Sequence, residues 1–461
     1  MTDFDLVVIG SGPAGEKGAV QAAYFGKHVA IVERAPEPGG AAVHTGTLPS
    51  KTLREAAIYL SGYRARDLYG ISVGLDATRA APSLLSRKET VRDLEVGRIR
   101  WNLERHGVAQ LSGRARFVDP LTLEVASPAG AQRLTAERFL IATGSKPYRP
   151  DEIDFSDPDI HDSDTVLALE RMPGSVTVLG GGVIGCEYAT MFAALGLPVR
   201  LVEARERLLP FLDGDMSEQL RLGMVRLGIE LHMADRYRAV RRLPGRGILT
   251  ELASGQEIVS DQLLFAAGRS GDTRELGLET AGVAVGKRDH VQIDRNYRTT
   301  VPHIYAAGDC IGFPALASTS TEQGRVAVCH AFGFAYKQHV SELLPYGVYT
   351  IPEVSCVGVT QEQAAERAIR SVAGRAFYRD NPRGKIIGDR EGLVKLVFDR
   401  ETRRLLGCHC IGEHATELVH IGQSLILLGG TVETLIEMVF NYPTLAELYK
   451  YAAYDALGQW N

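Results

Sequence analysis

The feature that most constrains this fold is a glycine-rich turn between two apolar strands, which occurs twice in the chain. Each copy reads G-x-G-x-x-G, continues into a helix and closes with a strand that ends on an acid. The matching positions, shifted by 170 residues, are Gly10, Gly12, Gly15 and Glu33 in the first copy and Gly180, Gly182, Gly185 and Glu203 in the second. Such glycines bring the backbone close to a pyrophosphate, and the acid accepts ribose hydroxyls. We therefore predict an α/β fold with two Rossmann-like units that bind two dinucleotides.

The alternative is that the second copy has degenerated and is kept only for folding. All four of its key positions are intact, which favours a second nucleotide site over a purely structural unit.

Length and charge set further limits. A chain of 461 residues is long enough for two to four domains with full cores. A formal net charge of −5 gives no basic face for nucleic acid or an anionic membrane. The sequence has no run of about 18 uncharged apolar residues, and its N-terminus lacks the positive segment of a signal peptide. We expect no nucleic-acid partner, no membrane span and a cytoplasmic location.

The six cysteines are scattered, which suits a reducing compartment. Cys408 and Cys410 flank His409 but lack the second pair of ligands that a zinc site requires. We expect the two thiols to point to one face of a strand, and we expect no metal.

The stretch from Gly39 to Lys51 resembles the flavin-facing segment of flavoprotein disulfide reductases, which reads Gly-Gly-x-Cys-x4-Cys-x-Pro-Ser-Lys. Ala42 stands at the first cysteine position and Thr47 at the second. A methyl group and a hydroxyl cannot cycle between disulfide and dithiol. A chain that keeps this scaffold must therefore pass electrons from the flavin without a thiol relay.

Later motifs keep the order of the same superfamily. Ala142-Thr143-Gly144 resembles the corner that closes the FAD unit, and Gly268 lies in its counterpart after the second unit. Gly308-Asp309 resembles the motif whose carboxylate binds the FAD ribityl chain, and a helix that opens over 313–317 would point its N-terminus at the flavin. The cofactor contacts that the resemblance implies are Gly10, Gly12, Gly15, Glu33, Gly40, Thr47, Lys51, Thr143, Gly144, Gly180, Gly182, Gly185, Glu203, Arg205, Gly268, Gly308, Asp309 and Ala317.

Four residues receive catalytic roles from the resemblance. Lys51 and Glu187 match the Lys-Glu pair that the superfamily places beside flavin N5. Near the C-terminus, Tyr442 replaces the histidine of the motif His-Pro-Thr-x-x-Glu, and Glu447 matches its acid. A phenol is a poor base near neutral pH, so the thiol pair and its base are absent together.

Gly-Thr-x-Pro-Ser-Lys with Phe-Asn-Tyr-Pro-Thr is similar to the soluble (Si-specific), FAD-containing NAD(P)+ transhydrogenases. That family moves hydride between NADPH and NAD+ by a ping-pong mechanism. The resemblance implies FAD as cofactor, NAD(H) and NADP(H) as substrates, and a homodimer, with a higher oligomer left open. Glu203 would favour NAD, while Arg205 and Arg207 would pair with the 2′-phosphate of NADP or remain exposed loop charges.

The expected domains are an FAD-binding part at 1–147, an NAD(P)-binding domain at 148–272, a return segment at 273–342 and an α+β dimerisation domain at 343–461. Helices are expected at 54–57 and 89–105, with a looser segment over 70–82 between them.

Two other functions remain open. A diaphorase or quinone reductase needs the same residues, although the Tyr442 motif favours transhydrogenation. An FAD-binding redox sensor or assembly subunit would not need the intact second unit.

Overall fold

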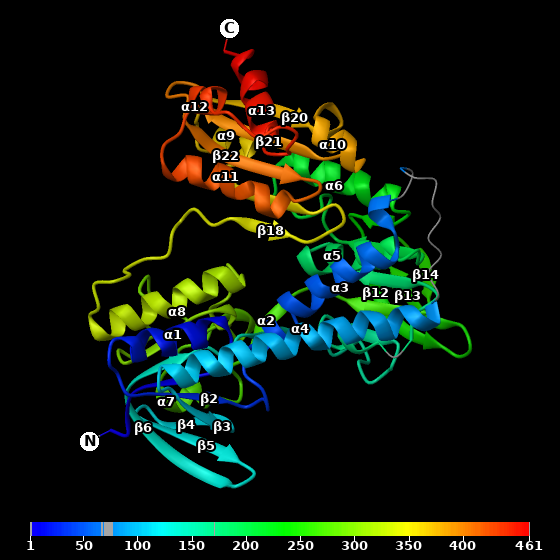
Figure 1. Cartoon of the computed structure of the whole chain (residues 1–461). Coiled ribbons are helices and arrows are strands. Elements are labelled where there is room, and N and C mark those ends of the chain that lie inside the picture. The colour runs from blue at the N-terminus through cyan, green and yellow to red at the C-terminus, as the bar shows by residue number, and fades with distance from the viewer. Residues whose placement is uncertain (1, 66–67, 69–76, 170, 461) are drawn as a thin grey trace.

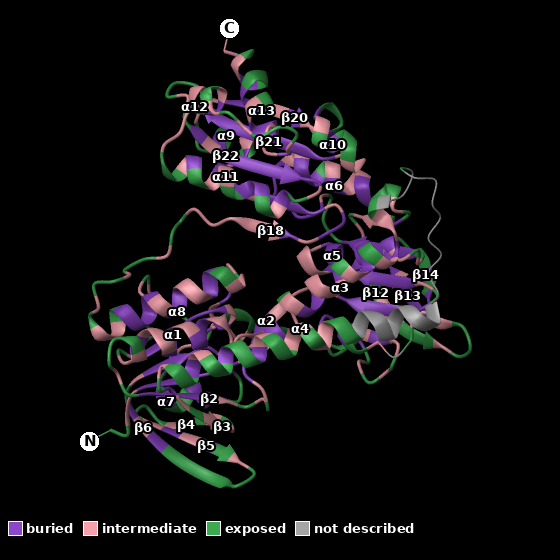
Figure 2. Cartoon of the chain, viewed as in Figure 1, coloured by how far each residue is buried: buried purple, intermediate pink, exposed green. Residues whose placement is uncertain are grey.

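The computed structural model describes residues 2–65, 68, 77–169 and 171–460, without the side chains of 65 and 77–85. Three large sheets organise this part of the chain (Figure 1). Figure 2 shows that buried residues concentrate in these sheets and in the helix faces packed on them. The predicted α/β class is confirmed.

The first sheet is built around the first glycine-rich unit, in which β1, α1 and β2 form the expected βαβ. The strand order is β3-β2-β1-β6-β5-β4, and β17 also pairs with β6. The apolar strand β1 lies between β2 and β6, parallel to both, and is buried on its two faces. The strands are β1 Phe4–Ile9, β2 Val29–Glu33, β3 Ala109–Ser112, β4 Arg114–Asp119, β5 Thr122–Ser127, β6 Gly130–Ile141 and β17 Ile304–Ala306.

Helices cover this sheet and carry the motifs. α1 and α8 lie side by side (Figure 1), so closely that a Cβ at Gly324 would lie 2.2 Å from the Ala14 carbonyl oxygen. The helix predicted to open over 313–317 is α8, which begins at Ala317. The helices of this part are α1 Pro13–Tyr24, α2 Gly40–His44, α3 Thr47–Leu60, α4 Ala77–Arg105, α7 Leu278–Ala281 and α8 Ala317–Phe332.

The second sheet repeats the arrangement with the order β11-β10-β9-β15-β8, all parallel. A three-stranded antiparallel sheet, β12-β13-β14, lies beside it, and β7 pairs with β16 in the connection between the two nucleotide units. The elements are β7 Ser145–Pro147, β8 Ile160–Asp162, β9 Val176–Leu179, α5 Val183–Ala194, β10 Val199–Glu203, α6 Gly214–Arg226, β11 Glu230–Met233, β12 Tyr237–Leu243, β13 Gly247–Leu252, β14 Glu257–Ser260, β15 Gln262–Phe265 and β16 Arg269–Gly271.

The C-terminal sheet is antiparallel, with the order β18-β19-β22-β21-β20. Its elements are β18 Tyr346–Val348, β19 Val354–Gly358, α9 Gln361–Glu366, β20 Ser371–Phe377, α10 Pro382–Ile387, β21 Leu393–Asp399, β22 Leu405–Ile411, α11 Ala415–Leu427, α12 Val432–Glu437 and α13 Leu448–Leu457. Cys408 and Cys410 point to one face, as predicted, with their sulfurs 3.8 Å apart beneath α11 and α13.

The opposite face of this sheet packs on α6 of the second unit through a buried ion-pair network. Lys395 Nζ lies 2.8 Å from Asp213 Oδ1 and 3.1 Å from Asp215 Oδ2, and Arg375 Nε donates to Asp215 Oδ2 at 2.7 Å. Lys395 and Asp213 are almost fully buried. The network ties the second unit to the C-terminal domain.

One element differs from the sequence-based expectation. The prediction of a looser segment over 70–82 is wrong for its last residues, because α4 already begins at Ala77 and continues through Pro82. Ala77, Ala80 and Ala81 favour a helix, and Pro82 lies near the helix start, where it removes one intrahelical hydrogen bond; positions 70–76 lie outside the described residues. The predicted boundaries at 147, 272 and 342 fall after β7, after β16 and before β18, and remain predictions.

Short 3₁₀ turns complete the chain: η1 Tyr63–Ala65, η2 Thr165–Ala168, η3 Lys287–Asp289, η4 Asp309–Ile311 and η5 Tyr378–Asp380. Within the described ranges, every helix is too short or too polar to cross a bilayer.

Candidate functional site

The glycine-rich turn of the first unit forms a concave stretch of backbone without side chains at the start of α1, called the cradle below. A Cβ at Gly10, where φ is +97°, would lie 2.5 Å from the Ala142 carbonyl oxygen, and a Cβ at Gly15 would lie 1.9 Å from the Gly10 carbonyl oxygen. Gly40 closes the other side, because its Cβ would lie 2.9 Å from the Gly12 Cα. With Gly12 capping a 12-residue helix, the cradle exposes N–H groups of the kind that bind a pyrophosphate.

Glu33 is held at the end of β2 by short, fixed donors. Its Oε2 accepts hydrogen bonds from the Ser11 backbone N–H at 2.9 Å and from Ser11 Oγ at 2.6 Å. Its Oε1 accepts from the Ala35 N–H at 2.8 Å. Ser11 is itself buried and accepts from the Gly39 N–H at 3.1 Å, so this carboxylate cannot swing away.

The predicted FAD contacts further along the chain converge on the same cradle. β17 brings Gly308 and Asp309 beside the Thr143-Gly144 corner, where Asp309 Oδ2 accepts a hydrogen bond from Ser145 Oγ at 3.0 Å. The Thr143 and Thr319 hydroxyls are buried and lack a hydrogen-bond partner among the described residues. Such orphaned hydroxyls fit a polar ligand, so these residues suit FAD. Thr319, in the first turn of α8 just after Ala317, was not predicted from the sequence.

The second unit repeats the glycine cradle. A Cβ at Gly185 would lie 1.8 Å from the Gly180 carbonyl oxygen, and Gly180 has a φ of +110°. Gly182 caps α5, while Gly268 stands at a φ of +124° beside Arg288. The geometry therefore offers a second dinucleotide site of the same kind.

Glu203 accepts four hydrogen bonds at the end of β10. Oε2 accepts from the Gly181 N–H at 2.6 Å and from Arg205 Nη2 at 3.0 Å. Oε1 accepts from the Arg205 N–H at 2.9 Å and from Arg205 Nε at 2.8 Å. Burial alone would raise the pKa of the Glu203 carboxyl, but the Arg205 guanidinium and the two backbone N–H groups together hold that pKa below its ordinary value. Glu203 is therefore an anion at neutral pH.

Arg207, the other predicted phosphate partner, is occupied differently. Its Nη2 donates to the carbonyl oxygens of Pro210 at 2.8 Å and Leu212 at 2.6 Å. It therefore fixes the loop before α6, whereas Arg205 contacts Glu203, the acid predicted to bind ribose.

Lys51 and Glu187 meet as predicted. Lys51 Nζ on α3 lies 2.7 Å from Glu187 Oε2 on α5, and the Glu187 side chain is only 4% exposed. Glu187 Oε1 accepts from the Tyr349 backbone N–H at 2.9 Å, and Lys51 Nζ lies 5.0 Å from the centre of the Tyr349 ring. Both units and the segment after β18 therefore meet at one partly buried charge pair. Tyr349 was not predicted, because a backbone donor leaves no signal in a sequence.

The positions that carry cysteines in the disulfide reductases lie on α2 and α3, the helix that carries Lys51. Ala42 is in α2 and Thr47 is the first residue of α3, four residues before Lys51. The six cysteines of the chain lie elsewhere, and five of them are buried. The segment therefore keeps its helical geometry without a thiol.

Tyr442 and Glu447 lie on the C-terminal domain and do not join the Lys51–Glu187 pair. The Tyr442 side chain is 72% exposed, and Glu447 Oε2 is buried without a hydrogen-bond partner among the described residues. Within those residues, no hydrogen bond links Tyr442 to Glu447 or either of them to Lys51. A single chain thus leaves this part of the predicted site unassembled.

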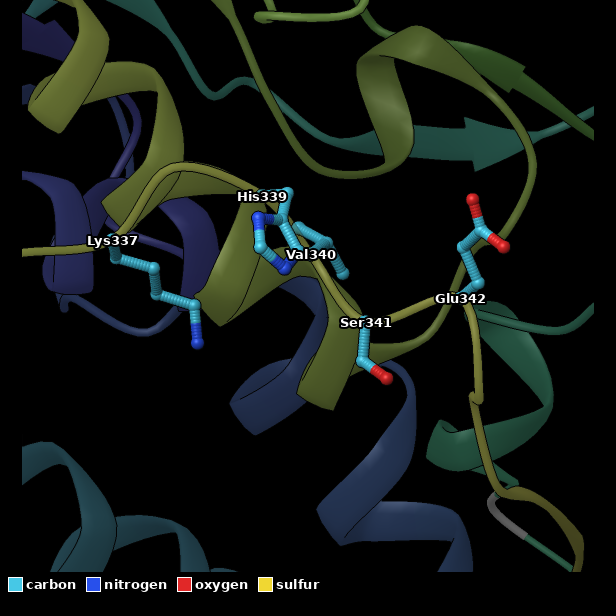
Figure 3. Close-up of a pocket in the computed structure, with 5 residues that line it drawn as sticks. All are labelled: Lys337, His339, Val340, Ser341 and Glu342. Carbon is cyan, nitrogen blue, oxygen red and sulfur yellow. The ribbon is translucent and has the colours of Figure 1, made fainter. Parts of the chain in front are cut away.

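A hollow of about 520 Å³ lies along the linker between α8 and β18 (Figure 3). Its lining residues are Lys337, His339, Val340, Ser341 and Glu342. None of the predicted site residues is among them, so the hollow is separate from the nucleotide cradles.

Comparison with known families matches nearly the whole chain. The family described as pyridine nucleotide-disulphide oxidoreductase matches residues 4–324, and the dimerisation domain of that family matches residues 344–453.

Individual proteins are similar over their full lengths. A protein of Mycobacterium bovis (strain BCG / Pasteur 1173P2) named soluble pyridine nucleotide transhydrogenase is 45% identical, over 100% of this chain and 98% of the relative. A protein of the same name from Pseudomonas paraeruginosa is 39% identical, over 99% of each chain.

Solved structures share the architecture. LpdA from Mycobacterium tuberculosis superposes with a TM-score of 0.89 at 28% identity, over 97% of this chain and 99% of that one. The HOCl-induced flavoprotein disulfide reductase RclA from Escherichia coli gives a TM-score of 0.88 at 26% identity, over 98% and 99%.

Proposed function

The chain belongs to the pyridine nucleotide-disulphide oxidoreductase family, and from this premise we propose that it transfers hydride between NADPH and NAD+ as an FAD-dependent transhydrogenase. The observation that carries the proposal is the pairing of two intact nucleotide cradles with Ala42 and Thr47 at both cysteine positions. Relatives named soluble pyridine nucleotide transhydrogenase support it.

We assign FAD to the first unit and NAD(P) to the second. The Gly10–Gly15 cradle would hold the FAD pyrophosphate, Glu33 its ribose, and Asp309 its ribityl chain, with Thr143 and Thr319 supplying hydroxyls. When bound, FAD supplies a carrier that takes hydride from one nicotinamide and gives it to the other. The Gly180–Gly185 cradle and Glu203 would hold each nicotinamide dinucleotide in turn.

The Lys51–Glu187 pair sets the electrostatics where the two units meet. The buried Glu187 carboxylate needs a counter-charge, which the partly buried Lys51 ammonium provides, while the Tyr349 N–H donates to the other carboxylate oxygen. The Lys51 ammonium is thereby held in one orientation. A fixed positive charge stabilises negative charge that develops next to it during hydride transfer.

The active form is proposed to be a homodimer in the cytoplasm. Each C-terminal domain would place Tyr442 and Glu447 at the site of the other subunit, where Tyr442 covers the position that a thiol base occupies in disulfide reductases. A phenol there adds bulk and a hydroxyl without a base for thiol chemistry.

An anaerobic two-step experiment tests the function. The yellow protein is reduced with NADPH, freed of NADP+ by gel filtration and mixed with thio-NAD+, whose reduction is followed by its own absorbance. We expect stoichiometric reduction of thio-NAD+ within the turnover time. Reoxidation only by quinone or oxygen, or any turnover of lipoamide or glutathione, would contradict the proposal.

A further inference from the structure

The ribose-binding acid of the second unit has no acceptor position left for a ribose. A carboxylate offers about four lone-pair positions, two on each oxygen. In Glu203 two are filled by the N–H groups of Gly181 and Arg205, and two by the Arg205 guanidinium. Any ribose hydroxyl that donates to Glu203 must displace one of these donors.

Only one of those donors is able to leave. The Gly181 and Arg205 N–H groups belong to backbone that follows β9 and β10, and Gly181 is packed so closely that a Cβ would lie 3.0 Å from the Glu203 Cβ. The Arg205 side chain is 49% exposed on a flexible stem, whereas the Glu203 side chain is only 6% exposed. The guanidinium therefore has a solvent-facing route away from the carboxylate, and it leaves when a ligand satisfies the buried Glu203 in its place.

We propose that Arg205 is a two-position gate that lets one site accept both NAD and NADP. With NAD, the ribose hydroxyls take the two positions that the guanidinium vacates on Glu203, and Arg205 turns to solvent. With NADP, the guanidinium gives up its hydrogen bonds to Glu203 and binds the 2′-phosphate. It then lies between this phosphate and the Glu203 carboxylate, two anions that would otherwise repel each other. This inference rests on the proposed function, since only an enzyme that alternates cofactors needs such a gate.

Arg205 is the arginine suited to this role. A planar guanidinium binds a carboxylate and a phosphate with the same two-pronged geometry, so it exchanges one partner for the other without losing its form of contact. Arg207 is held by the carbonyl oxygens of Pro210 and Leu212 and would have to release the loop before α6.

Two fragments that lack nicotinamide test the gate on the FAD-loaded protein. We expect Arg205→Ala to weaken binding of 2′,5′-ADP about 10- to 100-fold, the loss typical of hydrogen bonds to a charged group. Binding of 5′-ADP should become about two- to fivefold tighter, because no ion pair must be opened first. Isothermal titration calorimetry measures both, and flavin content with thermal unfolding checks the fold.

Arg200→Ala is the matched control. Arg200 lies on β10, is partly exposed and pairs with Glu230 at 3.2 Å, so its loss removes the same charge without touching Glu203. It should leave both affinities within about twofold, as expected for an exposed pair. Glu203→Gln should do the reverse of Arg205→Ala, strengthening 2′,5′-ADP and weakening 5′-ADP.

Equal weakening of both fragments by Arg205→Ala, or an unchanged affinity for 2′,5′-ADP, would overturn the gate. Neither fragment carries hydride, so these results do not depend on transhydrogenation. Fragments that behave as expected in a protein that fails to reduce thio-NAD+ would overturn the proposed function and leave the gate standing.

Discussion

The two glycine-rich units share a backbone and differ in what holds the acid at the end of the second strand. Both cradles exclude a Cβ at the last glycine, at 1.9 Å for Gly15 and 1.8 Å for Gly185. Glu33 is held by a buried serine hydroxyl, whereas Glu203 is held by a half-exposed guanidinium. A short neutral donor such as Ser11 Oγ suits a site whose ligand stays bound. A long cationic donor such as Arg205 suits a site whose ligands exchange.

The two solutions are not interchangeable. A Cβ at Gly181, the position equivalent to Ser11, would lie 2.8 Å from Leu208 Cδ2 and 3.0 Å from the Glu203 Cβ. A serine at position 181 would require the Leu208 and Glu203 side chains to shift, and in the second unit the acid takes a partner from the following loop instead. On the proposed assignment, the contacts that distinguish a resident from an exchanging nucleotide would lie within a few ångströms of one carboxylate.

The largest expected effect comes from filling either cradle. Gly15→Ala should give a protein without bound flavin, and Gly185→Ala a yellow protein whose affinity for NAD(P) falls by more than about 100-fold, because each methyl would overlap a backbone carbonyl. Absorbance at the flavin band and calorimetry separate the two losses. Gly97→Ala, in open space on α4, is the control and should change neither. Loss of both ligands from either variant would show that the units do not act separately.

The next effect concerns stability, since the Lys395 network ties the second unit to the C-terminal domain. Lys395→Met leaves Asp213 buried and unpaired and should lower the free energy of unfolding by about 3–5 kcal/mol. Denaturant unfolding followed by far-UV circular dichroism measures the loss. Arg370→Ala, which breaks an exposed pair with Glu401, should cost less than about 1 kcal/mol.

The same network predicts a pH dependence. Burial alone would raise the pKa of the Asp213 carboxyl, but His409 and Lys395 hold that pKa below its ordinary value. The stability from this carboxylate is therefore present above its unfolded pKa of about 3.9 and is lost as pH falls through the folded value. The difference in the free energy of unfolding between wild type and Lys395→Met should become smaller as the pH is lowered. A difference that is constant with pH would contradict this account.

The smallest expected effect comes from Ser11→Ala and tests the contrast between Glu33 and Glu203 directly. Ser11→Ala removes one of the three donors to Glu33 and should weaken FAD binding about 10-fold, with NAD(P) affinity unchanged. Flavin release during dialysis measures it. Ser127→Ala, in a hairpin of the same sheet, is the control. A change in NAD(P) affinity would mean that the units communicate through their acids.

Local sequence pattern predicted both βαβ units and the helix that begins at Ala317, whereas the Lys51–Glu187 pair was predicted only from the family resemblance. It did not reveal contacts made by backbone groups or by distant segments, such as the Tyr349 N–H on Glu187. The sequence also did not reveal why a glycine stands at position 374 within β20. That glycine is required by α13, since a Cβ there would lie 1.9 Å from the Ala452 carbonyl oxygen.

The N–H of Tyr349 gives the charge pair a property that neither of its side chains has. Substitutions at 51 or 187 can remove the ammonium or the carboxylate. At position 349 every residue except proline still has a backbone N–H that can donate to Glu187. The hydrogen bond to Glu187 is consequently insensitive to most substitutions at position 349. The side chain at 349 can therefore change beside the Lys51 ammonium while that hydrogen bond persists.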